Sequence, residues 1–200
     1  MMYTIISALI GYLIGSVNFA IIFSKIIYGN DIRNSGSGNP GATNAVRIYG
    51  KKFGLAIFFC DFSKGIIAVA AAKMIIGLTN APYEAMLAAG FFAQLGHILP
   101  VFHRFRGGKG VATAVGAAFA LMPLAAIILL ALFTIMLWAT KYVCVASGLC
   151  AAAYPILAFF LSGNKAVANC VFAALCAMLI LIRHLANFDR LRRGEEGKIK

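Results

Sequence analysis

Long runs of apolar residues constrain this chain more than any other feature of its sequence. The hydrocarbon core of a bilayer is ~30 Å thick, and a helix of about 20 apolar residues crosses it. The 200-residue chain is 62% hydrophobic and only 12% charged, whereas a soluble domain is about 45–50% apolar and about 25% charged. The sequence therefore predicts an all-α polytopic membrane protein with one integral-membrane domain over residues 1–200.

Seven transmembrane segments are predicted from the lengths of these runs. Five are unambiguous, whereas residues 111–140 form either one kinked helix or two helices separated at Pro123. We favour two helices, because this division gives a consistent orientation in the membrane. The predicted spans are residues 3–24, 53–77, 84–102, 111–122, 124–140, 142–161 and 166–182.

The basic residues predict the orientation, because Lys and Arg accumulate in cytoplasmic loops. With seven spans and the N-terminus outside, all of the 18 Lys and Arg residues except Lys64, Lys73 and Lys165 fall in inner loops or in the C-terminal tail. Six spans would place the basic tail opposite the basic loops. We therefore expect the N-terminus outside and the C-terminus in the cytoplasm.

The predicted span 111–122 is too short to cross a bilayer by itself, because twelve helical residues rise only ~18 Å. It is rich in Gly and Ala, as are membrane helices that pack closely against neighbours. We expect it inside the bundle, preceded by a loop that dips into the membrane. Irregular backbone at that depth must be buried in protein or line a wet cavity.

The charge balance predicts an anionic partner. The chain has 18 Lys and Arg residues against 6 Asp and Glu, a formal net charge of +12, which suits lipid headgroups, a phosphorylated substrate or nucleic acid. The five cysteines lie in apolar runs and have no metal-ligand spacing. We interpret them as small buried hydrophobic residues and predict no metal site.

The first of three polar segments, residues 34–47, combines glycines, hydrogen-bonding side chains and an arginine. Glycine allows backbone N–H groups to approach a ligand closely, and Arg can bind phosphate through two parallel hydrogen bonds. This composition favours a binding loop over a solvated turn. Its candidate binding residues are Ser37, Gly38, Asn39, Thr43, Asn44 and Arg47.

The second polar segment contains Gly107, Gly108, Lys109 and Gly110 immediately before the helix predicted from Val111. Free backbone donors, the positive end of a helix dipole and a lysine could converge there on one anion. The spacing differs from that of a Walker A motif. A positively charged topology signal is the alternative interpretation of this segment taken alone.

The third polar segment, residues 183–198, follows the last predicted span. On a helix, Asn187 shares a face with Arg183 and His184, which lie four and three residues earlier. His184 is the most plausible group for proton transfer near neutral pH. Snorkelling of basic side chains at a helix end explains the arginines that follow, but not the His and Asn.

Two charges inside the second span need an explanation. Asp61 and Lys64 are one helical turn apart, roughly 12 Å inside the membrane if this span starts at Phe53, and isolated ions there are costly. We expect an ion pair that supports the site, and a transport pathway is the alternative. His97 and His103 are expected to be structural.

Together these segments resemble the three cytoplasmic motifs of the bacterial acyl-phosphate:glycerol-3-phosphate acyltransferases, the PlsY family. The motifs are S-G-S-G-N-P-G-A-T-N-A-V-R, G-H-I-L-P-V-F-H-R-F-R-G-G-K-G-V-A-T and R-H-L-A-N-F-D-R-L-R-R-G-E-E-G-K, with D-F-S-K-G at 61–65. The resemblance implies a multi-pass protein of the bacterial cell (inner) membrane whose active site faces the cytoplasm. It implies transfer of a fatty acyl group from acyl phosphate to the sn-1 hydroxyl of glycerol 3-phosphate, giving lysophosphatidic acid and phosphate, without metal or cofactor. This reaction is the first acylation step of phospholipid synthesis.

The resemblance also implies roles for individual residues. It makes Gly107, Gly108 and Gly110 the phosphate cradle around Lys109, and Glu196 a structural residue. Arg106 and Cys144 replace a lysine and a serine that are common in the family. The implied catalytic residues are Ser37, Arg47, Lys109, His184 and Asn187, with Arg183 as a further substrate-binding residue.

The proton of the attacking hydroxyl passes either to His184 or to the departing phosphate, and the resemblance favours the phosphate. His184 and Asp189 match the H-x-x-x-x-D motif of acyl-CoA-dependent enzymes, but on a helix they would lie ~140° apart. The expected partners are glycerol 3-phosphate, acyl phosphate, membrane lipid and the soluble enzyme that makes acyl phosphate, and not nucleic acid. The competing function is a membrane transporter or carrier of an anionic phosphorylated substrate.

Overall fold

The computed structural model describes residues 1–80 and 82–199, and all of the regular structure in this range is helical. Six of its helical segments are long and apolar enough to cross a membrane, and Val111–Leu121 forms a shorter apolar helix. The predicted all-α membrane architecture is therefore confirmed. The number of membrane crossings and their orientation stay predictions.

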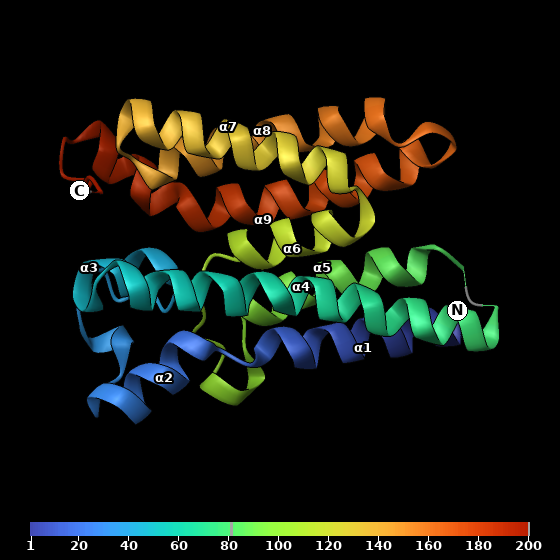
Figure 1. Ribbon diagram of the computed structural model, residues 1–200, viewed down its shortest axis with the longest axis horizontal. Helices are drawn as coiled ribbons and strands as arrows, with labels where there is room; N and C mark the ends of the chain where they lie inside the picture. Colours follow the sequence, from blue (N-terminus) through green and yellow to red (C-terminus); the bar gives the residue numbers. More distant parts are fainter. Residues whose placement is uncertain (81, 200) are drawn as a thin grey trace. The chain divides into compact units, whose positions relative to one another are not determined.

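The chain folds as two compact units, Met1–Leu121 and Met122–Lys200, each coloured as a continuous stretch of the spectrum (Figure 1). The prediction of one domain over the whole chain is not tested by this division. In the first unit, α1 (Met2–Ser16) packs against α5 (Glu84–Ile98) and α4 (Lys51–Thr79). The short helix α6 (Val111–Leu121) packs mainly against α4 and also against α5.

Glycines allow close approach between these helices. A side chain at Gly116 of α6 would collide with the backbone of Phe62 on α4, and one at Gly65 would collide with the backbone of Thr113. Membrane helices use such small residues to bring their backbones together. The expectation that the short Gly- and Ala-rich helix packs closely against a neighbouring helix is confirmed.

The predicted span 3–24 is divided into two helices, α1 and α2 (Phe19–Tyr28). Asn18 caps α2, because its Oδ1 accepts a hydrogen bond from the Ile21 N–H at 3.0 Å. Lys64 Nζ donates to the carbonyls of Gly15 at 3.2 Å and Val17 at 2.8 Å. These bonds satisfy carbonyl groups that the end of α1 leaves without helical partners.

The first polar segment lies at the end of the first unit opposite the N-terminus (Figure 1). The 3₁₀ turn η1 (Ile32–Asn34) leads into it, and the helix α3 (Ala42–Tyr49) forms its second half. Both rest on one apolar cluster. This cluster consists of the buried residues Ala20, Ile21, Ile32, Ala45 and Ile57, with α3 contributing Ala42, Ile48 and Tyr49 around it.

The predicted span 84–102 is α-helical only as far as Ile98. Pro100 follows, and then the 3₁₀ turn η2 (Val101–His103) and an irregular stretch that leads to α6. The helical part therefore ends before the basic residues of the second polar segment.

The second unit contains α7 (Pro123–Thr140), α8 (Val143–Leu161), the 3₁₀ turn η3 (Gly163–Lys165) and α9 (Ala166–Arg192). α8 packs against both α7 and α9. Pro123 begins α7, a position where its missing N–H has no helical partner to lose. The predicted division at Pro123 is therefore confirmed.

The last helix is longer than its predicted span of 166–182, because α9 continues to Arg192. The third polar segment therefore begins on a helix, as its spacing predicted. Beyond α9 the tail turns back along this unit. The Ile199 N–H donates to the Lys141 carbonyl at 2.9 Å, and Lys198 Nζ lies 5.5 Å from the centroid of the Tyr142 ring.

Candidate active site

The first polar loop is shaped by the side chain of Asn44. Its Oδ1 accepts a hydrogen bond from the Ser37 N–H at 2.9 Å, and its Nδ2 donates to the carbonyls of Ser35 at 3.0 Å and Ile32 at 3.4 Å. Asn44 is 1% exposed. Asn44 is predicted from the sequence to bind substrate. In the structure its side-chain amide forms hydrogen bonds with the backbone of the loop, and one of these bonds holds the exposed residue Ser37.

Glycine is required inside this turn. Gly36 has a φ of +59°, and a side chain there would collide with Asn44 Oδ1. The Gly38 N–H closes the turn by donating to the Ser35 carbonyl at 3.1 Å. Ser37 is exposed between the two glycines, so its hydroxyl and the turn around it are accessible to a ligand.

The other candidates of this loop lie on or just before α3. Asn39 and Thr43 are half-buried, and Arg47 is exposed on the last turn of α3. α3 carries Thr43 and Arg47, and its apolar side is buried against the cluster that contains Ile57. The predicted phosphate-binding residues of the first segment therefore come from one well-packed loop and helix.

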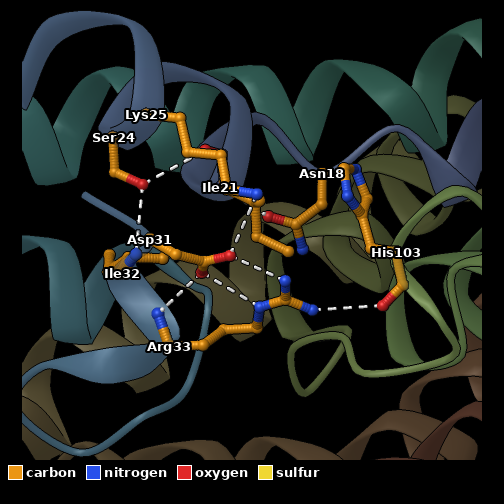
Figure 2. Close-up of polar contacts among 8 residues, drawn as sticks. All are labelled: Asn18, Ile21, Ser24, Lys25, Asp31, Ile32, Arg33 and His103. Atoms are coloured by element: carbon orange, nitrogen blue, oxygen red, sulfur yellow. Dashed lines mark hydrogen bonds and ion pairs between the residues drawn. The ribbon is translucent and has the colours of Figure 1, made fainter. Parts of the chain in front are cut away.

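A charged cluster precedes this loop (Figure 2). Arg33 bonds to both oxygens of Asp31, with Nε–Oδ1 at 3.0 Å and Nη2–Oδ2 at 2.7 Å, and its Nη1 donates to the His103 carbonyl at 3.1 Å. Hydrogen bonds from Arg33 hold the pKa of Asp31 well below its ordinary value, and the same pair raises the pKa of Arg33. Sequence reasoning assigned neither residue to the site. The signal it could have used is a carboxylate two residues before an arginine at the start of a glycine-rich loop.

The second polar loop folds back onto the end of α5. The N–H groups of Gly107 and Gly108 donate to the carbonyls of Ile98 at 3.2 Å and His97 at 3.1 Å. A side chain at Gly108 would collide with the His97 imidazole. Lys109 is half-buried and stands two residues before the start of α6. This is the position from which a lysine and a helix N-terminus can act on one anion.

The predicted ion pair in α4 is present. Lys64 Nζ lies 2.8 Å from Asp61 Oδ1, and both side chains are no more than 3% exposed. His97 joins them, with Nδ1 at 3.1 Å from Lys64 Nζ and 3.4 Å from Asp61 Oδ1. The His97 imidazole also packs against Gly108, so it lies between the buried Asp61–Lys64 pair and the second polar loop. The sequence analysis predicted a structural role for His97 but not its contacts with Asp61, Lys64 and Gly108.

The third polar segment presents its polar pair on one face of α9. His184 and Asn187 are both buried, whereas Arg183 is exposed. The His184 Nδ1 lies 2.7 Å from the Ile180 carbonyl. A carbonyl can only accept, so Nδ1 carries the proton and Nε2 of the neutral ring is the acceptor.

The C-terminal tail holds Asn187 in place. Asn187 Nδ2 donates to Glu196 Oε1 at 2.9 Å, and Arg190 Nε donates to Glu196 Oε2 at the same distance. The Glu196 side chain is only 5% exposed. These contacts agree with the structural role predicted for Glu196.

The candidate residues are divided between the two units. The first unit contains Ser37, Arg47 and Lys109 with their glycines, and the second contains Arg183, His184, Asn187 and Glu196. Arg106 is exposed near the second loop, and Cys144 is buried in α8. Within residues 1–80 and 82–199, no three His, Cys, Asp or Glu side chains are grouped to hold a metal ion.

Known proteins resemble this chain over nearly its full length. The family model described as glycerol-3-phosphate acyltransferase matches residues 5–194. The glycerol-3-phosphate acyltransferase of Syntrophotalea carbinolica is 41% identical over 98% of this chain and 97% of its own length. That of Neisseria meningitidis serogroup C is 38% identical over 99% of this chain and 98% of its own.

Two crystal structures of PlsY, an integral membrane glycerol 3-phosphate acyltransferase, share the fold at 34% identity. The glycerol 3-phosphate form superposes with a TM-score of 0.88, covering 98% of this chain and 96% of PlsY. The lysophosphatidic acid form gives 0.84 over 98% and 95%. The resemblance inferred from the three polar segments is thereby confirmed, and the chain belongs to the glycerol-3-phosphate acyltransferase family.

Proposed function

We propose that this protein transfers a fatty acyl group from acyl phosphate to the sn-1 hydroxyl of glycerol 3-phosphate. The observation that carries the proposal is the match over 98% of the chain to PlsY, described in a glycerol 3-phosphate form and a lysophosphatidic acid form. These two forms correspond to an acceptor and its acylated product. The reaction would begin phospholipid synthesis in the cell membrane.

The bonds and protons of this reaction balance without a protein nucleophile. The hydroxyl oxygen of glycerol 3-phosphate attacks the acyl carbonyl carbon, and the bond from that carbon to the phosphate oxygen breaks. Lysophosphatidic acid and inorganic phosphate are the products. The hydroxyl proton passes to the departing phosphate, which family resemblance favours, or to Nε2 of His184, the acceptor nitrogen of the neutral ring when Nδ1 donates to the Ile180 carbonyl.

Two phosphate groups must meet in this reaction, so positive charge and positioning are the main requirements. We assign phosphate binding in the first unit to Ser37 and Arg47 of the first loop and to Lys109 of the second. Arg183, His184 and Asn187 would orient substrate from α9. The supporting hydrogen bonds within each unit are those of the Asn44 side chain to the first loop, of the Gly108 N–H to the His97 carbonyl, and of Asn187 to Glu196.

We place the chain in the bacterial inner membrane with seven spans, the N-terminus outside and the polar loops in the cytoplasm. The close packing of α6 against α4 supports counting the short helix as part of the membrane bundle. A water-soluble acceptor would then arrive from the cytoplasm while the acyl chain enters from the bilayer. The soluble enzyme that makes acyl phosphate would be a partner on the same side.

The test is acyl transfer by the full chain, purified and returned to lipid nanodiscs. Acyl phosphate and acyl-CoA are offered separately with labelled glycerol 3-phosphate, and lysophosphatidic acid and phosphate are both quantified. We expect equimolar products from acyl phosphate. Turnover with acyl-CoA alone would overturn the donor assignment, and uptake of glycerol 3-phosphate into sealed vesicles without acylation would favour the competing transporter.

A further inference from the structure

We propose that Arg33 is a positioning residue that connects the two polar loops of the first unit, so that both act on one substrate phosphate. The proposal rests on the proposed function, in which Ser37 of the first loop and Lys109 of the second bind phosphate. Arg33 precedes Ser37 by four residues, and its carbonyl partner on His103 precedes Lys109 by six. A single side chain therefore connects backbone close to both proposed phosphate ligands.

The guanidinium of Arg33 donates hydrogen bonds from two of its edges. One edge forms a two-point contact with Asp31, and Nη1 on the other side reaches the His103 carbonyl (Figure 2). A two-point carboxylate contact fixes the plane and the direction of a guanidinium. The remaining N–H groups therefore point in a set direction, which a lysine ammonium could not reproduce.

Asp31 is itself firmly held. Its Oδ1 accepts a hydrogen bond from the Arg33 N–H at 3.0 Å, and its Oδ2 lies 3.3 Å from Lys25 Nζ of α2. The next residue, Ile32, donates its N–H to Ser24 Oγ on α2 at 3.2 Å. The arginine is thus attached to a helix rather than to a freely moving loop.

Both loops have hydrogen-bonded anchors of their own besides this connection. The Gly107 N–H bonds to the Ile98 carbonyl, which closes the stretch that contains His103. In the first loop, Asn18 Nδ2 donates to the Pro40 carbonyl at 3.3 Å, beyond the Ser37 turn. Because each loop is anchored separately, we infer that the bond from Arg33 sets the spacing between the two loops.

The first experiment measures this connection without using activity. Hydrogen–deuterium exchange of the full chain in nanodiscs is compared between wild type, Arg33→Met, Arg33→Lys and Asp31→Asn. The matched control is Arg193→Met, which removes an exposed pair between Asp189 of α9 and the residue that follows this helix, four positions later in the chain. We expect faster exchange of amides 34–38 and 104–108 together in Arg33→Met and Arg33→Lys, and no change in the control.

The second experiment separates positioning from general stability. Arg33→Met should raise the KM for glycerol 3-phosphate about tenfold while the KM for acyl phosphate changes less than twofold. If Asp31 acts only through Arg33, the double variant Asp31→Asn with Arg33→Met should have the same KM for glycerol 3-phosphate as Arg33→Met alone. The thermal unfolding midpoint of Arg33→Lys should stay close to that of wild type. If Arg33→Met folds poorly, the same KM measurements are therefore made on Arg33→Lys.

Three results would overturn the proposal: exchange that rises in the first loop only, exchange that rises in neither loop, or a fall in kcat with unchanged KM. If wild type transferred no acyl group from acyl phosphate, the proposed function would fail. Coupled exchange of both loops would still be measurable in that case, and its presence or absence would decide whether Arg33 connects them.

Discussion

The two units hold their polar residues in different ways. In the first unit, Ser37 and Lys109 lie in irregular loops, and side chains such as Asn44 and Arg33 bind loop carbonyls to keep them in place. In the second unit, His184 and Asn187 lie on α9, where the helix itself sets their spacing. A loop site needs dedicated supporting side chains, whereas a helix site needs few. Substitutions of supporting residues should therefore be more damaging in the first unit.

The largest effect is expected from Lys64→Met. It leaves Asp61 as an uncompensated charge beside His97, and breaking a buried pair by removing one partner costs about 3–5 kcal/mol. It also removes the donor to the carbonyls of Gly15 and Val17 at the end of α1. Thermal unfolding in detergent should show a strongly lowered midpoint.

The double variant Asp61→Asn with Lys64→Met sharpens this prediction. It removes both charges, so it should recover part of the lost stability although the α1 carbonyls remain unpaired. Equal instability of the single and double variants would show that the charge pair is not the cause.

Asn44→Ala should have the next largest effect. It removes the acceptor of the Ser37 N–H and one of the donors to the Ser35 and Ile32 carbonyls, and a donor left unsatisfied costs about 1–3 kcal/mol. We expect a loss of roughly 10²-fold in kcat/KM because Ser37 is no longer held. Asn44→Asp keeps an acceptor for Ser37 and should lose less. If the two variants were equally inactive with normal folding, a direct ligand role for Asn44 would be the better explanation.

These differences also explain what the sequence could and could not predict. Hydropathy predicted α4 to within two residues at each end, since helical length in a membrane follows from apolar content. Helical spacing predicted that His184 and Asn187 share a face, and both are buried. The bond from Arg33 to the His103 carbonyl and the bonds from Lys64 to the end of α1 join residues that are distant in the chain, so no local pattern could reveal them.

In the second unit, substitution of Glu196 is the counterpart of Asn44→Ala, because Glu196 supports Asn187 on α9 as Asn44 supports Ser37. Glu196→Ala removes the carboxylate that accepts from Asn187 Nδ2 and Arg190 Nε, but α9 still carries both residues. We expect a fall of about 1 kcal/mol in stability and a smaller loss of kcat/KM than in Asn44→Ala. Glu196→Gln keeps an acceptor for Asn187 and should lie between Glu196→Ala and wild type. A loss equal to that of Asn44→Ala would contradict the comparison between loop and helix sites.

The smallest effect concerns pH and the contact between Asp31 and Arg33. The pKa of Asp31 is lowered in the folded protein because Arg33 hydrogen-bonds its ionised form. A carboxylate of this kind stabilises the fold fully above its unfolded pKa of about 3.9, and that stabilisation is lost as the pH falls towards the folded pKa.

The difference in stability between wild type and Asp31→Asn should therefore be constant from about pH 5 to 8, at about 1 kcal/mol. It should shrink below about pH 4, where Asp31 begins to bind a proton in the unfolded chain. Denaturation midpoints of both proteins across this range measure the difference, and a change centred near neutral pH would mean that another group controls the contact.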